Sequence, residues 1–143
     1  ILDNYPISSI TEIDKAWDIP LAEIDDKVYS LNDIEHKVIR PNFNDPRIHF
    51  AVNCAAKSCP KLLNEAFTEN NIDTQLESQT LSFINNFSFN KLSKDNAKLS
   101  KIFEWYAEDF GDITSYINRY SQVKISAKAE ISYLTYDWSL NVR

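Results

Sequence analysis

The sequence has no methionine, a single glycine, and only two cysteines and two histidines among its 143 residues. It also lacks a long apolar run: its uninterrupted apolar stretches are far shorter than the ~20 residues that span a bilayer. We therefore expect a chain that does not span a membrane. Because methionine is missing even at position 1, we expect a processed or trimmed piece of a longer product, from which a targeting signal could have been removed.

Positive charge is also scarce. Lys and Arg number 15 against 21 Asp and Glu, which gives a net charge of −6. Such a chain repels phosphate backbones, so we expect no nucleic-acid partner. No Pro, Ser or Gly tract indicates a linker, and a hydrophobic share of 43% is that of a globular protein. We predict a single domain over residues 1–143, long enough to bury about 70% of the surface that its unfolded form exposes.

Short β-prone runs separated by polar turns predict hairpins, whereas runs with apolar residues at helical spacing predict helices. The sole glycine, Gly111, is placed to end one helix, and Asp112 to cap the next. The predicted hairpins cover 21–29 and 87–99, the helices 31–38, 61–67, 73–87, 100–110 and 112–120, and further strands 47–54 and 130–141. Because these elements follow no regular βαβ rhythm, the predicted class is α+β, with short antiparallel strands and hairpins packed against several helices.

All imidazole and thiol groups lie between His36 and Cys59, so a thiol nucleophile with an imidazole base, a soft-metal site or a disulfide must be built there. The alternating pattern from Arg47 to Cys54 predicts a strand with Cys54 facing the core and His49 on the polar face. Cys59 lies just before Pro60 and a predicted helix. A thiol at a helix start has its thiolate stabilised by the helix dipole.

These positions predict a thiol-dependent hydrolase or acyltransferase. Cys59 is the candidate nucleophile, and His49 is the candidate base. A nearby acid would orient the imidazole ring, and the candidates are Glu35, Asp137 and Asp45. Two further side chains on the polar face are candidate substrate contacts: Arg47 for a carboxylate and Asn53 for a carbonyl. The substrate would be a small molecule or a peptide, and we expect no cofactor.

Three alternatives remain open at this point. The first is a zinc site made by both cysteines and both histidines, although the predicted strand points Cys54 and His49 in opposite directions. The second is a disulfide between Cys54 and Cys59, which is feasible if the intervening loop turns back. The third is a non-catalytic binding or scaffold domain in which the motif only joins a strand to a helix. Its groove would be lined by aromatic residues, namely Trp105, Tyr133, Tyr136 and Trp138.

Several runs in order along the chain resemble the domain-of-unknown-function 547 family. They are Ser30 to Glu35, Asp45 to Cys54, Ser58 to Pro60, Ser100 to Tyr106 with Asp109 and Phe110, and Tyr136 to Asn141. The resemblance spans nearly the whole chain. It implies a bacterial or plant protein, with a periplasmic or extracellular location more in keeping with its bacterial members. By analogy it also implies a distant relation to the papain and transglutaminase fold.

Members of that family carry an aromatic-rich helix before the equivalent of Tyr5 and Pro6. This chain begins only at the end of that helix. The resemblance therefore implies a family-like domain without its N-terminal part, and a possible partner in the missing segment.

Overall fold

A computed structural model describes residues 1–141. The chain forms two compact units: one contains residues 1–45, 54–57 and the C-terminal stretch from Trp138, and the other contains residues 46–53 and 58–137. Helices and short strands occur together, with the strands in two small sheets, so the α+β class is confirmed. The single-domain boundary stays a prediction.

The first unit contains a two-stranded hairpin and a helical segment made of a π-helix followed directly by α1. Its elements are the 3-10 helices Leu2–Asn4 and Ile10–Glu12, the strands β1 (Ala22–Ile24) and β2 (Lys27–Tyr29), the π-helix Asp33–Ile39, and α1 (Arg40–Phe43). The predicted hairpin is present. Its turn residues, Asp25 and Asp26, have φ values of 50° and 59°, and a two-residue type I′ turn requires positive φ at both positions.

The predicted helix over 31–38 begins as expected but differs in form and end. Ser30 and Asp33 cap it reciprocally, because the Ser30 Oγ accepts from the Asp33 amide at 3.1 Å and the Asp33 carboxylate accepts from the Ser30 amide at 3.0 Å. Lys37 and Ser30 together lower the pKa of Asp33 to about 2. The prediction that the helix ends before Pro41 is wrong. Pro41 lies in the first turn of α1, where a missing amide hydrogen costs little.

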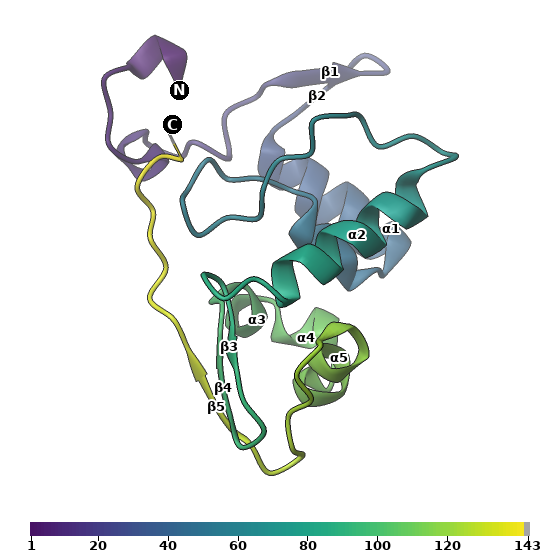
Figure 1. The fold of residues 1–143 in the computed structure, drawn as a ribbon. Helices are drawn as coiled ribbons and strands as arrows, with labels where there is room; N and C mark the ends of the chain where they lie inside the picture. The colour runs from purple at the N-terminus through teal and green to yellow at the C-terminus, as the bar shows by residue number, and fades with distance from the viewer. Residues whose placement is uncertain (142–143) are drawn as a thin grey trace. The chain divides into compact units, whose positions relative to one another are not determined.

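The second unit contains the principal core. Its elements are the 3-10 helix Pro46–Phe50, α2 (Ile72–Ile84), β3 (Lys91–Leu92), β4 (Asn96–Leu99), α3 (Ile102–Trp105), α4 (Ala107–Phe110), α5 (Ile113–Tyr120) and β5 (Glu130–Tyr133). Figure 1 shows β3, β4 and β5 side by side next to α3. β3 and β4 are antiparallel, but β5 joins β4 in parallel, which the predicted antiparallel arrangement did not include. The predicted C-terminal strand ends at Tyr133.

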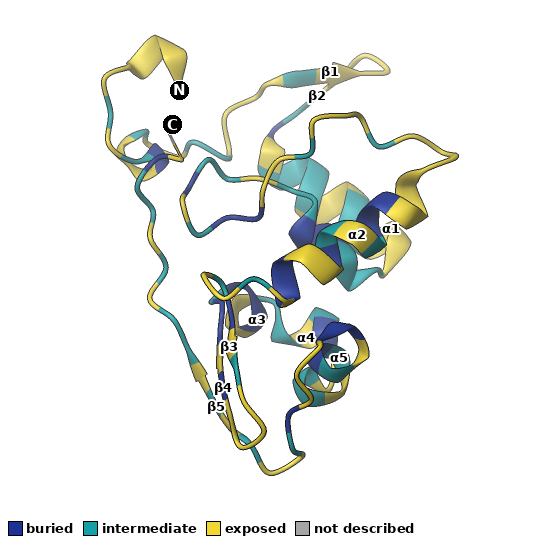
Figure 2. Ribbon diagram, viewed as in Figure 1, coloured by how far each residue is buried: buried dark blue, intermediate teal, exposed yellow. Residues whose placement is uncertain are grey.

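Aromatic rings fill this core. Phe50, Phe83, Phe103 and Phe110 are buried and contact one another, with ring centroids 4.8 to 6.5 Å apart. They bring together the 3-10 helix, α2, α3 and α4. Figure 2 shows buried and exposed residues along the same turns of α2, as an amphipathic helix requires. Phe87, the last residue of the predicted helix over 73–87, lies beyond the end of α2 and is 72% exposed.

The predicted strand over 47–54 is wrong. Pro46 to Phe50 form a 3-10 helix, and the amides of Ala51 and Val52 both donate to the carbonyl of Ile48, at 2.9 and 3.1 Å. Three consecutive residues, Ile48 to Phe50, are buried, which a strand with one exposed face does not permit. Local turn hydrogen bonds therefore take the place of strand pairing, and the expected alternation of buried and exposed side chains is not found.

The predicted helix over 61–67 is also wrong, since no helix or strand lies between Pro60 and the start of α2. The predicted helix over 100–110 is present as two short helices, α3 and α4, which meet at Tyr106. α4 ends at Gly111, whose φ of 63° is a backbone conformation that L side chains rarely adopt.

Asp112 caps α5 as the sequence predicts. Its carboxylate accepts a hydrogen bond from the Ser115 amide at 2.8 Å, and hydrogen bonds from the side chain and the amide of Ser115 lower the pKa of Asp112. We expect Asp112→Ala to lower the free energy of unfolding by about 1 kcal/mol, because an amide at the start of α5 loses its acceptor. Urea denaturation followed by circular dichroism measures the change. Glu69→Ala, which removes an exposed acid outside any helix, is the control, and an equal loss in both variants would contradict the capping role.

Candidate functional site

The structure assigns the predicted site residues to different units. His49, Cys59, Arg47, Asn53 and Asp137 belong to the second unit, whereas Glu35 belongs to the first, within the π-helix Asp33–Ile39. The site is therefore described from the second unit. His36 is exposed, and its Nδ1 lies 3.0 Å from a guanidinium nitrogen of Arg40.

His49 is a buried imidazole with a carboxylate partner. Its side chain is 1% exposed, and its Nε2 lies 2.7 Å from Oδ2 of Asp109. This burial overturns the expected position of His49 on a polar strand face, because the 3-10 helix turns the ring inward. A carboxylate is an acceptor only, so in the neutral ring the proton belongs on Nε2 and Nδ1 is the basic nitrogen. The pair has the base and orienter arrangement of general-base sites.

One short stretch of chain supplies three neighbours of the His49 ring. Tyr106 stacks on it with ring centroids 3.9 Å apart and an interplanar angle of 25°, and Phe110 lies at 5.5 Å. Tyr106, Asp109 and Phe110 are three and four residues apart, which places them on one face of a helical turn. The Asp109 amide donates to the Tyr106 carbonyl at 2.9 Å and closes that turn.

Asp109 is the functional candidate that the sequence reasoning missed, since the orienting acid was sought at Glu35, Asp137 and Asp45. A signal was present in the family-like motif that joins Tyr106 with Asp109 and Phe110. The spacing of those residues predicts one helical face. It does not say which imidazole that face meets.

Cys59 is buried, with 4% of its surface exposed. Its thiol donates a long hydrogen bond, 3.9 Å, to the carbonyl oxygen of Val52. No helix begins between Pro60 and the start of α2 at Ile72, so the expected stabilisation of the Cys59 thiolate by a helix dipole is absent. Cys54, which we expected in the core, is half-buried in the first unit, and both cysteines are in the thiol form.

The loop that carries Cys59 is anchored on both sides. The Asn53 side-chain amide donates to the Pro60 carbonyl at 2.7 Å. On the other side, the Ser58 amide donates to the Asp137 carbonyl at 3.2 Å, and the Asp137 amide donates to the Ser58 hydroxyl at 2.9 Å. Asn53 and Asp137 thus contact the two residues that flank Cys59 in the sequence, Pro60 and Ser58.

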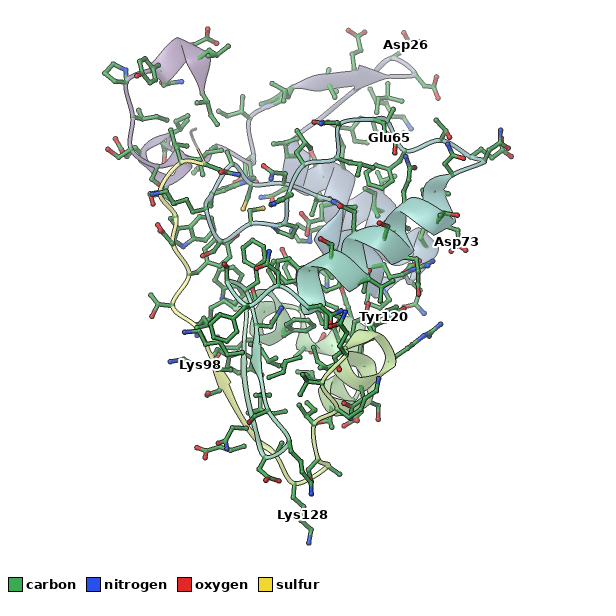
Figure 3. All side chains as sticks on the ribbon, viewed as in Figure 1. Asp26, Glu65, Asp73, Lys98, Tyr120 and Lys128 are labelled. Atoms are coloured by element: carbon green, nitrogen blue, oxygen red, sulfur yellow. The ribbon has the colours of Figure 1, made fainter. Side chains whose placement is uncertain are left out.

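Arg47 binds two carboxylates of α2. Its guanidinium lies 2.7 Å from Asp73 and 3.5 Å from Glu77, while its own side chain is 19% exposed. Figure 3 labels Asp73 near the beginning of α2. Because Asp73 and Glu77 are four residues apart on one helix face, one planar guanidinium reaches both. Arg47 therefore fixes the 3-10 helix to α2.

A small hollow of about 10 Å³, room for about one water molecule, lies beside the segments that carry His49 and Cys59. Phe50, which follows His49, and Pro60, which follows Cys59, both line it. Its other lining residues are Lys61, Gln79, Ser82, Phe83, Asn86 and Phe89. Gln79 donates to the backbone carbonyls of Lys61 and Phe50, at 2.7 and 3.3 Å. It thereby links the segment that follows Cys59 to the segment that follows His49.

The family model described as "Protein of unknown function, DUF547" matches residues 6–84, more than half of the chain. The chain belongs to the DUF547 family. The matched segment of this DUF547 chain includes His49, Cys59, Arg47 and Asn53, whereas Asp109 lies outside it. No curated protein and no solved structure is detectably similar to the chain.

Two further findings concern metals and membranes. Within residues 1–141, no three His, Cys, Asp or Glu side chains gather in a group that could hold a metal ion. In the same part of the chain, none of the helices combines the length and the apolar character needed to cross a bilayer.

Proposed function

We propose that this DUF547 chain is a thiol-dependent hydrolase or acyltransferase that acts on peptide or amide bonds. Cys59 is the nucleophile, His49 is the general base, and Asp109 orients the imidazole. The observation that carries the proposal is the contact of the buried His49 with the partly exposed Asp109, with 2.7 Å between Nε2 and Oδ2. A buried imidazole held on a carboxylate is suited to accept a thiol proton, because the carboxylate stabilises the imidazolium that forms.

In this mechanism, Cys59 Sγ bonds to the carbonyl carbon of the substrate while its proton moves to His49 Nδ1. The imidazolium then gives that proton to the leaving amine as the carbon–nitrogen bond breaks, which leaves a thioester on Cys59. Water then attacks the carbonyl carbon of the thioester while His49 takes a proton from the water. The imidazolium gives this proton to the Cys59 thiolate as the carbon–sulfur bond breaks and the carboxylic acid leaves. An amine in place of water would form a new amide.

The proposal assigns the orienting role to Asp109 rather than to Glu35 or Asp137. Substrate binding by Arg47 and Asn53 stays a prediction, since both side chains hold other parts of the second unit. The relation to the papain and transglutaminase fold also stays a prediction.

The second candidate is a non-catalytic domain in which the motif holds the fold together. The burial of Cys59 favours it, because buried structural thiols are inert. The pairing of Asn53 with Pro60 favours it as well. In that case the thiol and the imidazole take part in no reaction, and any ligand would bind another surface.

Acylation by p-nitrophenyl acetate distinguishes the two candidates. The catalytic proposal predicts a burst of nitrophenolate and a single acetyl group on Cys59, located by peptide mass spectrometry. We expect Cys59→Ala to abolish the burst and His49→Gln to slow it by about 10²–10⁴-fold, the usual contribution of a general base. Cys54→Ala is the matched control and keeps the burst. No acetyl group on Cys59, or equal rates in the parent and His49→Gln, would sink the catalytic proposal.

A further inference from the structure

We propose that Tyr106 is a positioning residue for His49: its ring fixes the plane of the imidazole and stabilises the protonated form. The inference rests on the proposed function, in which His49 accepts and returns a proton. It follows from three features of the second unit, namely the stacking geometry, the position of Tyr106 in the chain, and the direction of the Asp109 hydrogen bond.

The hydrogen bond to Asp109 alone does not fix the ring. An in-plane contact at Nε2 sets one direction of the imidazole but leaves rotation about the Nε2···Oδ2 axis, so the direction of Nδ1 is open. The Tyr106 ring, 3.9 Å away and 25° from parallel, blocks that rotation. Phe110, at 5.5 Å and tilted by 52°, restricts the ring from another direction. Together the contacts fix where Nδ1 points, which proton transfer requires.

Tyr106 is itself held in place. It is partly buried and packs against the hydrophobic core. Its backbone, with φ of −114° and ψ of 28°, marks the break between α3 and α4. Tyr106 and Asp109 are three residues apart, so one turn supplies both the stacked ring and the carboxylate.

The stacked phenol also acts on the charge of His49. An aromatic face carries partial negative charge and attracts a cation above it, by up to about 2 kcal/mol where water is excluded. The Asp109 carboxylate, on the same turn, also contacts the ring and favours the imidazolium too. Arg47, two residues earlier, has its guanidinium on Asp73 and Glu77 of α2.

Titration of the imidazole signals by nuclear magnetic resonance tests the inference without any substrate. The chain has only two histidines, and the exposed His36 is an internal reference. We expect Tyr106→Leu to lower the pKa of His49 by about 0.5–1.5 units, the equivalent of the cation–aromatic attraction, and to leave His36 unchanged. Tyr106→Phe keeps the stacked ring and should restore the parental value.

Trp105→Leu is the matched control, because Trp105 is the neighbouring exposed aromatic residue and its ring contacts Tyr136. If Tyr106→Leu does not fold, pentafluorophenylalanine at position 106 keeps the shape of the ring but reverses its charge distribution, so it should lower the pKa of His49 relative to Tyr106→Phe. An unchanged His49 titration in these variants overturns the inference. So does an equal shift in Trp105→Leu. Failure of Cys59 acylation in the parent protein would count against the proposed function and would leave this titration result standing on its own.

Discussion

The Phe50→Ala variant should unfold with a free energy about 3–5 kcal/mol below that of the parent, the usual cost of truncating a buried phenylalanine. Phe50 is fully buried, and its ring contacts Phe83, Phe103 and Phe110 with centroids 4.9, 5.7 and 5.8 Å away. Removing it loses the transfer free energy of the ring and leaves a cavity where the 3-10 helix, α2, α3 and α4 meet. Urea denaturation followed by circular dichroism measures the loss.

Phe87→Ala is the matched control, because the same atoms are removed from a ring that is 72% exposed. That ring contacts the ammonium of Lys91 at 5.3 Å, an exposed contact of small energy. We expect a change within about 0.5 kcal/mol. Equal losses in the two variants would mean that the second unit is not organised around Phe50.

Elements whose signals are local could be predicted from the sequence. The hairpin of β1 and β2 was predicted from a two-residue polar turn, and α5 from the Asp112 cap at its start. α2 was predicted from its apolar spacing, although the predicted helix extended too far, to Phe87. In each case the residues that determine the element are close together in the sequence, so a local pattern is enough to predict it.

The segment from Arg47 to Cys54 shows where local patterns fail. Ile48 and Phe50 alternate with polar residues as in a strand, yet His49 between them is buried as well. Its burial depends on Tyr106 and Asp109, which are far along the chain. Periodicity predicts that a polar residue is exposed, because a local pattern carries no information about a partner that is distant in the sequence.

The candidate site was predicted in part for the same reason. The clustering of both thiols and both imidazoles in one window is visible in the sequence, and it led to His49 and Cys59. The third member lies 60 residues away, so sequence distance gave no reason to choose Asp109 over Glu35 or Asp137. Only folding of the second unit brings α4 to the 3-10 helix.

Asp109→Asn is expected to slow acylation of Cys59 by about 10²–10⁴-fold while the protein remains folded. An asparagine of the same shape can still contact Nε2, but it no longer carries the charge that stabilises the imidazolium. Its amide group can also donate to Nε2, which would move the ring proton to Nδ1 and remove the basic nitrogen from its working position. The burst of nitrophenolate from p-nitrophenyl acetate gives the rate, and circular dichroism confirms the fold.

Glu108→Gln separates this role from a general effect of charge, because it removes the same negative charge from an exposed neighbour on α4. That variant should acylate at the parental rate. The pH profile adds a second criterion: loss of Asp109 lowers the pKa of His49, since the imidazolium loses its carboxylate, so the His49 titration should move to lower pH in Asp109→Asn and stay in place in Glu108→Gln. If both variants slow the reaction alike, the carboxylate of Asp109 acts only through the surface charge of α4, and His49 has no dedicated orienting partner.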